Sequence, residues 1–162
     1  MDLLERIAAE RECERLTYRY CEAVDLGHAS RLADVFAADG VFEAGGLHLV
    51  GRKEIRRVFT DRERVRELRT RHVCTNLHIE VLNEATATGV VYLTLFRRRG
   101  SVDWSVPIPT TAPALIGSYH DRYVRTADGW RIAARHQQVV FVDPSDTGWS
   151  PVGHDPLSGE SS

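Results

Sequence analysis

An aspartate and a histidine, far apart along the chain, are the two residues best suited to acid–base chemistry. Asp25 stands near the end of "YRYCEAVDLG", and His72 is the second residue of "RHVCTNLHIEV", in which apolar residues alternate with groups that titrate or hydrogen-bond. A carboxylate that accepts a hydrogen bond from one imidazole nitrogen fixes the tautomer and raises the basicity of the other nitrogen. If the fold brings them together, Asp25 and His72 form a general base.

Other polar residues could complete such a site. Tyr20 precedes Asp25 by five residues, and Arg135 shares its side of a predicted strand with apolar residues. A charge in that setting requires a buried carboxylate or a negative charge that develops on a substrate. Tyr20 and His72 also have a structural interpretation. Tyr20 could be a core aromatic with its hydroxyl at the rim, and His72 could be a strand histidine whose hydrogen bonds are satisfied within the fold. Further candidates for a pocket are Asn76, Ser118 and His120.

Other classes of site lack their sequence patterns. The chain contains no nucleophile elbow, P-loop or dinucleotide-binding glycine motif, and its histidines lack the spacing of a metal site. Its 3 cysteines are an odd number without a CxxC pair, which argues against a disulfide framework or a zinc site. We therefore expect neither a cofactor nor a metal.

Composition indicates one ordinary globular domain. The chain has 162 residues, 43% hydrophobic and 27% charged, with a formal net charge of −2. This balance does not favour nucleic acid or an anionic membrane as a partner, and the arginine-rich stretch 51–71 is interleaved with acids, as in a solvated helix face. No signal peptide or membrane-spanning stretch is recognisable, so we expect a cytoplasmic protein.

Periodicity predicts helices first and strands afterwards. Apolar residues recur at three- and four-residue steps over the first segments, and the period changes to two from about residue 70. Gly27 and Gly40 would end the first two helices, and Gly45-Gly46 would form a hairpin. The predicted helices are 2–26, 30–40 and 52–68, with strands at 41–44, 47–50, 71–82, 87–99, 113–126 and 129–142. We expect residues 1–143 to form the domain and 144–162 a poorly ordered tail.

This order predicts an α+β fold in which long antiparallel strands curl over the helices and leave a pocket at one end. In that arrangement His72 and Asn76 would face the pocket. The apolar residues of the same strand would then lie on its other side, in the core or at a subunit interface, namely Val73, Leu77, Ile79 and Val81.

The order of segments resembles a known superfamily over roughly residues 3–143. A long helix ending "YCEAVDLGHASRLADVFAADGVFE", a "GRKEI" helix, "RHVCTNLHIEV" and a closing "YHDRYVRTADGWRIAARHQQVVF" are similar to the SnoaL-like branch of the nuclear transport factor 2-like (NTF2-like) superfamily. The resemblance implies a conical barrel, with three N-terminal helices packed in the concave face of a strongly curved, mostly antiparallel sheet.

Within that superfamily the chain looks most like scytalone dehydratase, hexachlorocyclohexane dehydrochlorinase and bile-acid 7α-dehydratase. Asp25 and His72 fall where those enzymes have an Asp–His pair, and Tyr20 and Arg135 also fall at positions of their active sites. Arg97 stands where scytalone dehydratase has a second catalytic histidine. Two pocket positions of that enzyme correspond to Ser118 and His120.

The resemblance implies a cofactor-independent lyase, of the dehydratase or eliminase type, that acts on a hydrophobic cyclic molecule. His72 would be the base, Asp25 would orient it, Tyr20 would donate to the leaving oxygen or an enolate, and Arg135 would stabilise negative charge. Binding of the substrate would involve Asn76, Ser118, His120 and Arg97.

Two alternatives remain open. An isomerase or polyketide-type cyclase could use the same base, and a ligand-binding or assembly domain, such as the small subunit of a ring-hydroxylating dioxygenase, would have the fold without the chemistry. The resemblance also implies a homo-oligomer assembled through the convex face of the sheet, with a trimer favoured over a dimer.

Overall fold

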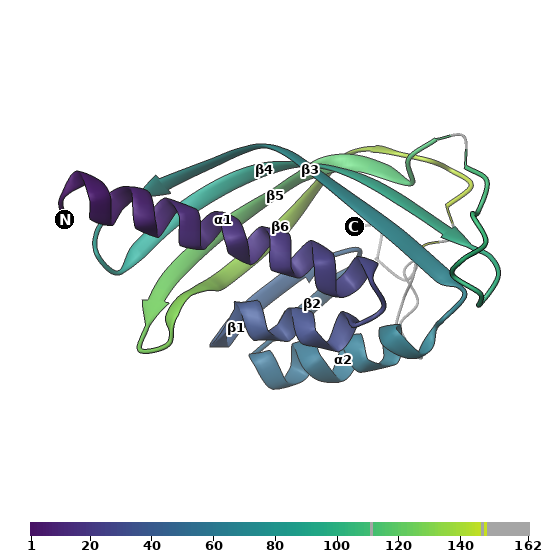
Figure 1. Cartoon of the computed structure of the whole chain (residues 1–162), viewed down its shortest axis with the longest axis horizontal. Helices are drawn as coiled ribbons and strands as arrows, with labels where there is room; N and C mark the ends of the chain where they lie inside the picture. Colours follow the sequence, from purple (N-terminus) through teal and green to yellow (C-terminus); the bar gives the residue numbers. More distant parts are fainter. Residues whose placement is uncertain (111, 147, 149–162) are drawn as a thin grey trace, which may run out of the picture.

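The computed structural model describes residues 1–110, 112–146 and 148. Three helices pack on one mixed sheet of six strands, and the sheet does not close, so the expected α+β fold is confirmed (Figure 1). The strand order is β2-β1-β6-β5-β4-β3, and every neighbouring pair is antiparallel except β1 with β6. The elements are α1 (Leu3–Asp25), η1 (Ala29–Val35), β1 (Phe36–Ala44), β2 (Leu47–Val50), α2 (Arg52–Arg64), β3 (Leu68–Val81), β4 (Thr86–Arg99), β5 (Leu115–Thr126) and β6 (Gly129–Val142).

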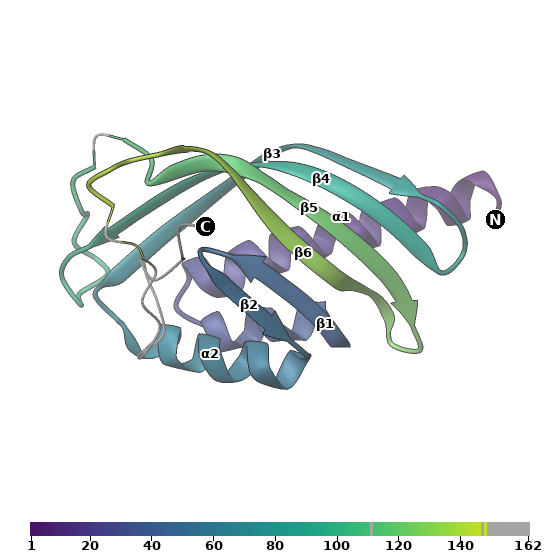
Figure 2. The same cartoon turned by 180° about the vertical axis from the view of Figure 1, so that it is seen from behind.

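Helix α1 lies along the concave side of the long strands, while η1, α2 and the β1–β2 hairpin gather near its C-terminal end (Figures 1 and 2). It begins with a capping box, in which the Asp2 carboxylate accepts from the backbone of Glu5 and the Glu5 carboxylate accepts from that of Asp2. Its buried residues recur every three or four positions, as one helical face requires. None of the described helices is long and apolar enough to cross a membrane.

The predicted second helix is partly wrong. Residues 29–35 form a short 3-10 helix, and strand β1 already begins at Phe36. Phe36 is fully buried and pairs with Ile132 of β6 in the parallel part of the sheet. Pairing and burial therefore override the helical pattern of this stretch. The predicted hairpin around Gly45-Gly46 is confirmed as β1 and β2, and both glycines have positive φ.

Strand β3 changes its inward face halfway along. A register shift lies between Thr75 and His78, and Asn76, inside it, has φ of 50°. Before this bulge the even-numbered residues point toward the helices, whereas after it the odd-numbered residues do. The expected facing is therefore wrong in part: Asn76 is exposed, while Ile79 and Val81 are buried on the same side as His72 and Val73 faces outward.

The predicted tail lies mostly outside the described residues. Its first residues are described, and they turn back toward the sheet. The backbone N–H of Asp146 donates to the carbonyl of Asp143, and the Asp143 carboxylate pairs with Arg98 of β4 at 2.8 Å.

Candidate active site

The C-terminal end of α1 places Asp25 against strand β3. The helix ends in a Schellman motif, because the N–H of His28 donates to the carbonyl of Ala23 and Gly27 between them has φ of +82°. Asp25 is therefore the last helical residue, and 6% of it is exposed. The guanidinium of Arg71 donates to its backbone carbonyl at 2.9 Å, which places a cation at the negative end of the helix dipole.

The Asp25 carboxylate contacts His72 twice. Its Oδ1 lies 2.7 Å from the imidazole Nδ1, and its Oδ2 accepts from the backbone N–H of His72, also at 2.7 Å. The hydroxyl of Thr70, two residues earlier on the same face of β3, donates to Oδ1 at 2.7 Å. These contacts fix the imidazole through Nδ1, and no described residue hydrogen-bonds Nε2.

The electrostatics of Asp25 favour the carboxylate. Burial would raise the pKa of this carboxyl, but the hydrogen bonds from His72 and Thr70, together with the charge of His72, outweigh it. The pKa of Asp25 therefore lies below its ordinary value. An ionised Asp25 can only accept hydrogen bonds, which assigns the proton of the short contact to Nδ1 of His72.

A small cavity lies beside the imidazole. It encloses about 90 Å³ between α1, α2 and the inner face of the sheet, and most of its lining is aromatic or aliphatic. The lining includes Tyr20, Val24, Phe42, Leu47, Phe59, Arg62, Thr70, His72, Leu95, Arg97, Leu115, Tyr119 and Gln137. A larger hollow of about 520 Å³ lies between α1 and η1, but its lining contains neither Asp25 nor His72.

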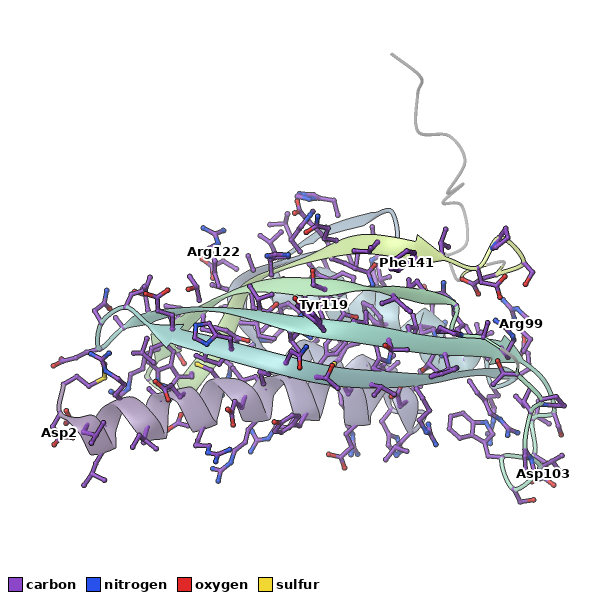
Figure 3. All side chains as sticks on the ribbon, turned by 90° about the horizontal axis from the view of Figure 1, so that it is seen from above. Asp2, Arg99, Asp103, Tyr119, Arg122 and Phe141 are labelled. Carbon is purple, nitrogen blue, oxygen red and sulfur yellow. The ribbon has the colours of Figure 1, made fainter. Side chains whose placement is uncertain are left out.

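Tyr20 lies over the imidazole. The two rings are edge-to-face with centroids 5.9 Å apart, and Tyr20 makes a second edge-to-face contact with Tyr119 at 5.8 Å. Burial raises the pKa of Tyr20 well above its ordinary value, more than the nearby charge of Arg135 and a hydrogen bond from Tyr119 lower it. The phenol of Tyr20 therefore stays protonated and can donate a hydrogen bond into the cavity. Figure 3 labels Tyr119 in the middle of the sheet.

Arg135 lies behind the cavity and is not among its lining residues. It is fully buried, and its Nε and Nη2 donate to the two carboxylate oxygens of Asp121 at 2.8 and 2.6 Å. Its guanidinium lies against two adjoining rings, 4.5 Å from the centroid of Tyr20 and 4.4 Å from that of Tyr119. Of the two explanations that the sequence left open for this charge, the structure shows the buried carboxylate, which is Asp121. Any effect of Arg135 on a substrate therefore passes through the tyrosines.

Three of the predicted substrate-binding residues lie away from the cavity. Ser118 and His120 alternate with the inward Tyr119, so they lie on the opposite face of β5, where Ser118 Oγ is 3.0 Å from His120 Nε2. Asn76 is exposed at the bulge. The structure therefore brings Tyr20, Asp25, His72 and Arg97 together at the cavity and leaves Asn76, Ser118 and His120 outside it.

Sequence reasoning missed several residues at the cavity. Thr70 shares the two-residue alternation with His72, so the strand pattern contains its signal. Arg62 continues the buried stripe of Ile55, Val58 and Phe59 by one further step of three, although the charges around it indicate a solvated face. Tyr119 and Gln137 carry no signal beyond strand alternation.

The described side chains offer no cluster of three or more His, Cys, Asp or Glu that could hold a metal ion. The thiols of Cys21 and Cys74, next to the dyad, are hydrogen-bonded at 3.5 Å and form no disulfide. The groups available for chemistry at the cavity are therefore a carboxylate, an imidazole, phenols and guanidiniums.

Comparison with known proteins identifies the class. A SnoaL-like domain model matches residues 5–136, and the chain belongs to this family. Its fold is similar to that of an NTF2-like protein with a cystatin-like fold from Novosphingobium aromaticivorans, which is 22% identical with a TM-score of 0.69 over 85% of each chain. No curated protein is significantly similar to the chain in sequence.

Among solved structures, a Mycobacterium tuberculosis protein of unknown function is 26% identical, with a TM-score of 0.68 over 86% of this chain and 77% of that one. A Novosphingobium aromaticivorans protein assigned provisionally as a scytalone dehydratase is 19% identical, with a TM-score of 0.71 over 93% and 97%. LinA, a hexachlorocyclohexane dehydrochlorinase, is 18% identical, with a TM-score of 0.71 over 93% and 99%. The latter two likenesses show the shared fold.

Proposed function

We propose that this protein is a cofactor-independent lyase of the dehydratase or eliminase type, which acts on a hydrophobic cyclic molecule with His72 as its general base. The observation that carries the proposal is the double contact between the Asp25 carboxylate and His72 at the wall of a mostly apolar cavity. A structural histidine does not need a buried carboxylate on its ring and its backbone at once.

His72 removes the proton in this proposal. Because Asp25 holds Nδ1 as the protonated nitrogen, Nε2 carries the lone pair that can accept a proton from a carbon next to a leaving group. The electron pair of the broken C–H bond forms the new C=C bond. Asp25 stabilises the imidazolium that results, as the carboxylate of a catalytic triad does.

Tyr20 assists the leaving group. Its protonated phenol donates a hydrogen bond to the departing oxygen or to an enolate oxygen, and the guanidinium of Arg135 beside its ring favours that donation. The imidazolium of His72 then returns the proton to the departing hydroxide. Water leaves, and the enzyme ends in its starting protonation state.

The test is a screen of hydroxylated cyclic compounds for products that have lost the mass of water. The proposal expects such a product with the wild type. Replacing Asp25 by Asn should lower kcat roughly 10³- to 10⁴-fold, by analogy with triad aspartates. His72→Gln should lower it about 10²- to 10⁴-fold, the usual contribution of a general base.

A matched control is His78→Gln, which changes an exposed histidine of the same strand and should leave the rate unchanged. Turnover that survives His72→Gln would contradict the assignment of the base. A product of unchanged mass with a shifted double bond, still dependent on His72, would instead identify an isomerase that uses the same dyad.

A further inference from the structure

Two guanidiniums at the cavity are not explained by the acid–base dyad. Arg62 of α2 and Arg97 of β4 both line the cavity. Thr70 pairs with Arg97 across the β3–β4 ladder, while His72 pairs with Leu95, so Arg97 stands two residues along the strand from the level of the imidazole. At the rise of a strand this offset is roughly 7 Å.

Arg62 is a buried cation that forms no close ion pair among the described residues, although the charges of Asp25 and Glu67 act favourably on it. Only 6% of it is exposed, and its one hydrogen bond among the described residues runs from Nη2 to the carbonyl of Leu68 at 3.2 Å. Burial and then the like charge of Arg97 lower its pKa to about 10. A buried charge is costly unless it is paired, so this guanidinium favours an anion in the cavity.

Arg97 already holds a carboxylate from the segment after β6. Its Nε donates to Oδ1 of Asp146 at 3.2 Å and its Nη2 donates to Oδ2, the two-point geometry by which arginine recognises carboxylates. The Asp146 side chain is 7% exposed in this contact. Arg97 lines the cavity, and its guanidinium is thus already paired with a carboxylate of the chain itself.

We infer that the natural substrate carries a carboxylate, which binds at Arg97 and Arg62 after displacing Asp146, while its ring lies against His72. The inference rests on the proposed function for the role of His72 but concerns binding alone. The cavity volume of about 90 Å³ agrees with a displacement, because a cavity of roughly 150 Å³ is known to admit benzene and a cyclic substrate needs additional room.

The test compares benzoate with its uncharged analogue benzamide by calorimetric titration of the full chain. We expect the wild type to bind benzoate more tightly than benzamide. Arg97→Gln should weaken benzoate about tenfold, the scale of one charge-assisted pair, and leave benzamide unchanged. Asp146→Asn should tighten benzoate about tenfold, because it removes the internal competitor.

The decisive variant is Asp146→Asn, because it changes a residue outside the strands and helices. Glu54→Gln is its matched control, since Glu54 forms an exposed ion pair at 2.8 Å with Arg57 and with neither cavity arginine. Equal affinities for benzoate and benzamide, or benzoate affinity that ignores Asp146→Asn, would overturn the inference. Tighter binding of inorganic phosphate than of benzoate would also overturn it in favour of a bare-anion site.

The two proposals fail separately. His72→Gln should abolish turnover and retain the preference for benzoate, so a lost rate with intact carboxylate binding supports both. A neutral cyclic alcohol that is dehydrated at full rate by Arg97→Gln would leave the lyase intact and reject the carboxylate.

Discussion

At the scale of single residues, two buried arginines and a half-buried one show how the surroundings of a guanidinium determine its role. Arg135 forms an ion pair with Asp121 and lies against the rings of two tyrosines, so its guanidinium is engaged within the fold and does not meet a ligand. Arg97 pairs with the carboxylate of Asp146, which a ligand displaces in the inference above, and Arg62 forms no close ion pair among the described residues. Only the last two are therefore free to recognise an anionic ligand.

The ionisation of Asp25 should make stability depend on pH. Because the pKa of Asp25 is lower in the folded protein than in the unfolded chain, its stabilisation is present above the ordinary carboxyl value and is lost as the pH falls through the folded value. We expect the difference in unfolding free energy between the wild type and Asp25→Asn to be largest near neutrality and to shrink below about pH 4.

Urea unfolding at several pH values measures this difference. Thr70→Val, which removes one hydrogen bond to Asp25 Oδ1, should give a weaker pH dependence than the wild type. A difference between wild type and Asp25→Asn that stays constant down to pH 3 would mean that the carboxylate is not stabilised by its partners.

At the scale of elements, the bulge of β3 decides which side chains enter the site. Asn76 adopts the left-handed conformation there, which an Asn tolerates and a β-branched residue resists. We expect Asn76→Gly to leave stability about unchanged and Asn76→Val to lower it by about 1–2 kcal/mol in chemical denaturation. Thr75→Val, at the exposed neighbour without positive φ, is the control. Equal stability of the Gly and Val variants would argue against the bulge.

The same bulge explains what the sequence could and could not predict. Alternation in "RHVCTNLHIEV" correctly suggests that His72 faces inward, and Asp25 follows from the periodicity of α1 and its glycine stop. A single alternation continued past Asn76 then assigns the wrong faces. The one local signal of the shift is Asn76, because asparagine is depleted in strands and tolerates the left-handed conformation, but a single such residue does not define a bulge.

Arg62 and Asp146 were missed for a different reason. The charged surroundings of Arg62 on α2 hide its place in the apolar stripe, and the contact of Asp146 spans 49 residues to Arg97. Such contacts depend on the tertiary fold, which local patterns do not contain. The order of elements predicted the α+β architecture, and the residue types suggested the Asp25–His72 pair, which the family resemblance supported. The resemblance also placed Ser118 and His120 toward the cavity, whereas β5 turns them away from it.

At the scale of the whole molecule, an apolar row crosses the outer face of the sheet. The strand registers join Val73 to Thr94, Thr94 to Ile116 and Ile116 to Phe141, and all four lie on the face away from the cavity. Phe141 is 65% exposed (Figure 3). Contiguous exposed apolar surface commonly marks an interface, which agrees with the proposed homo-oligomer.

We expect the wild type to sediment as an oligomer, and as a trimer if the implication of the family resemblance holds. Phe141→Lys should shift it toward the monomer in sedimentation velocity. Leu4→Lys, at a more exposed residue near the start of α1, is the control and should leave the oligomer intact. A wild type that is monomeric at high concentration would contradict this assignment of the outer face.

The contact between Asp25 and the backbone of His72 also occupies an N–H group at the edge of the sheet, where a strand of another molecule could otherwise pair. Strand β3 is an edge of the sheet, and the N–H of His72 points away from β4 to the Asp25 carboxylate. An unpaired edge amide is a template on which another strand can add. Asp25→Ala would expose this N–H group, whereas Asp25→Asn keeps an oxygen that can accept a hydrogen bond from it. If only the alanine variant precipitates, the cause is the unprotected edge of the sheet and not the loss of the general base.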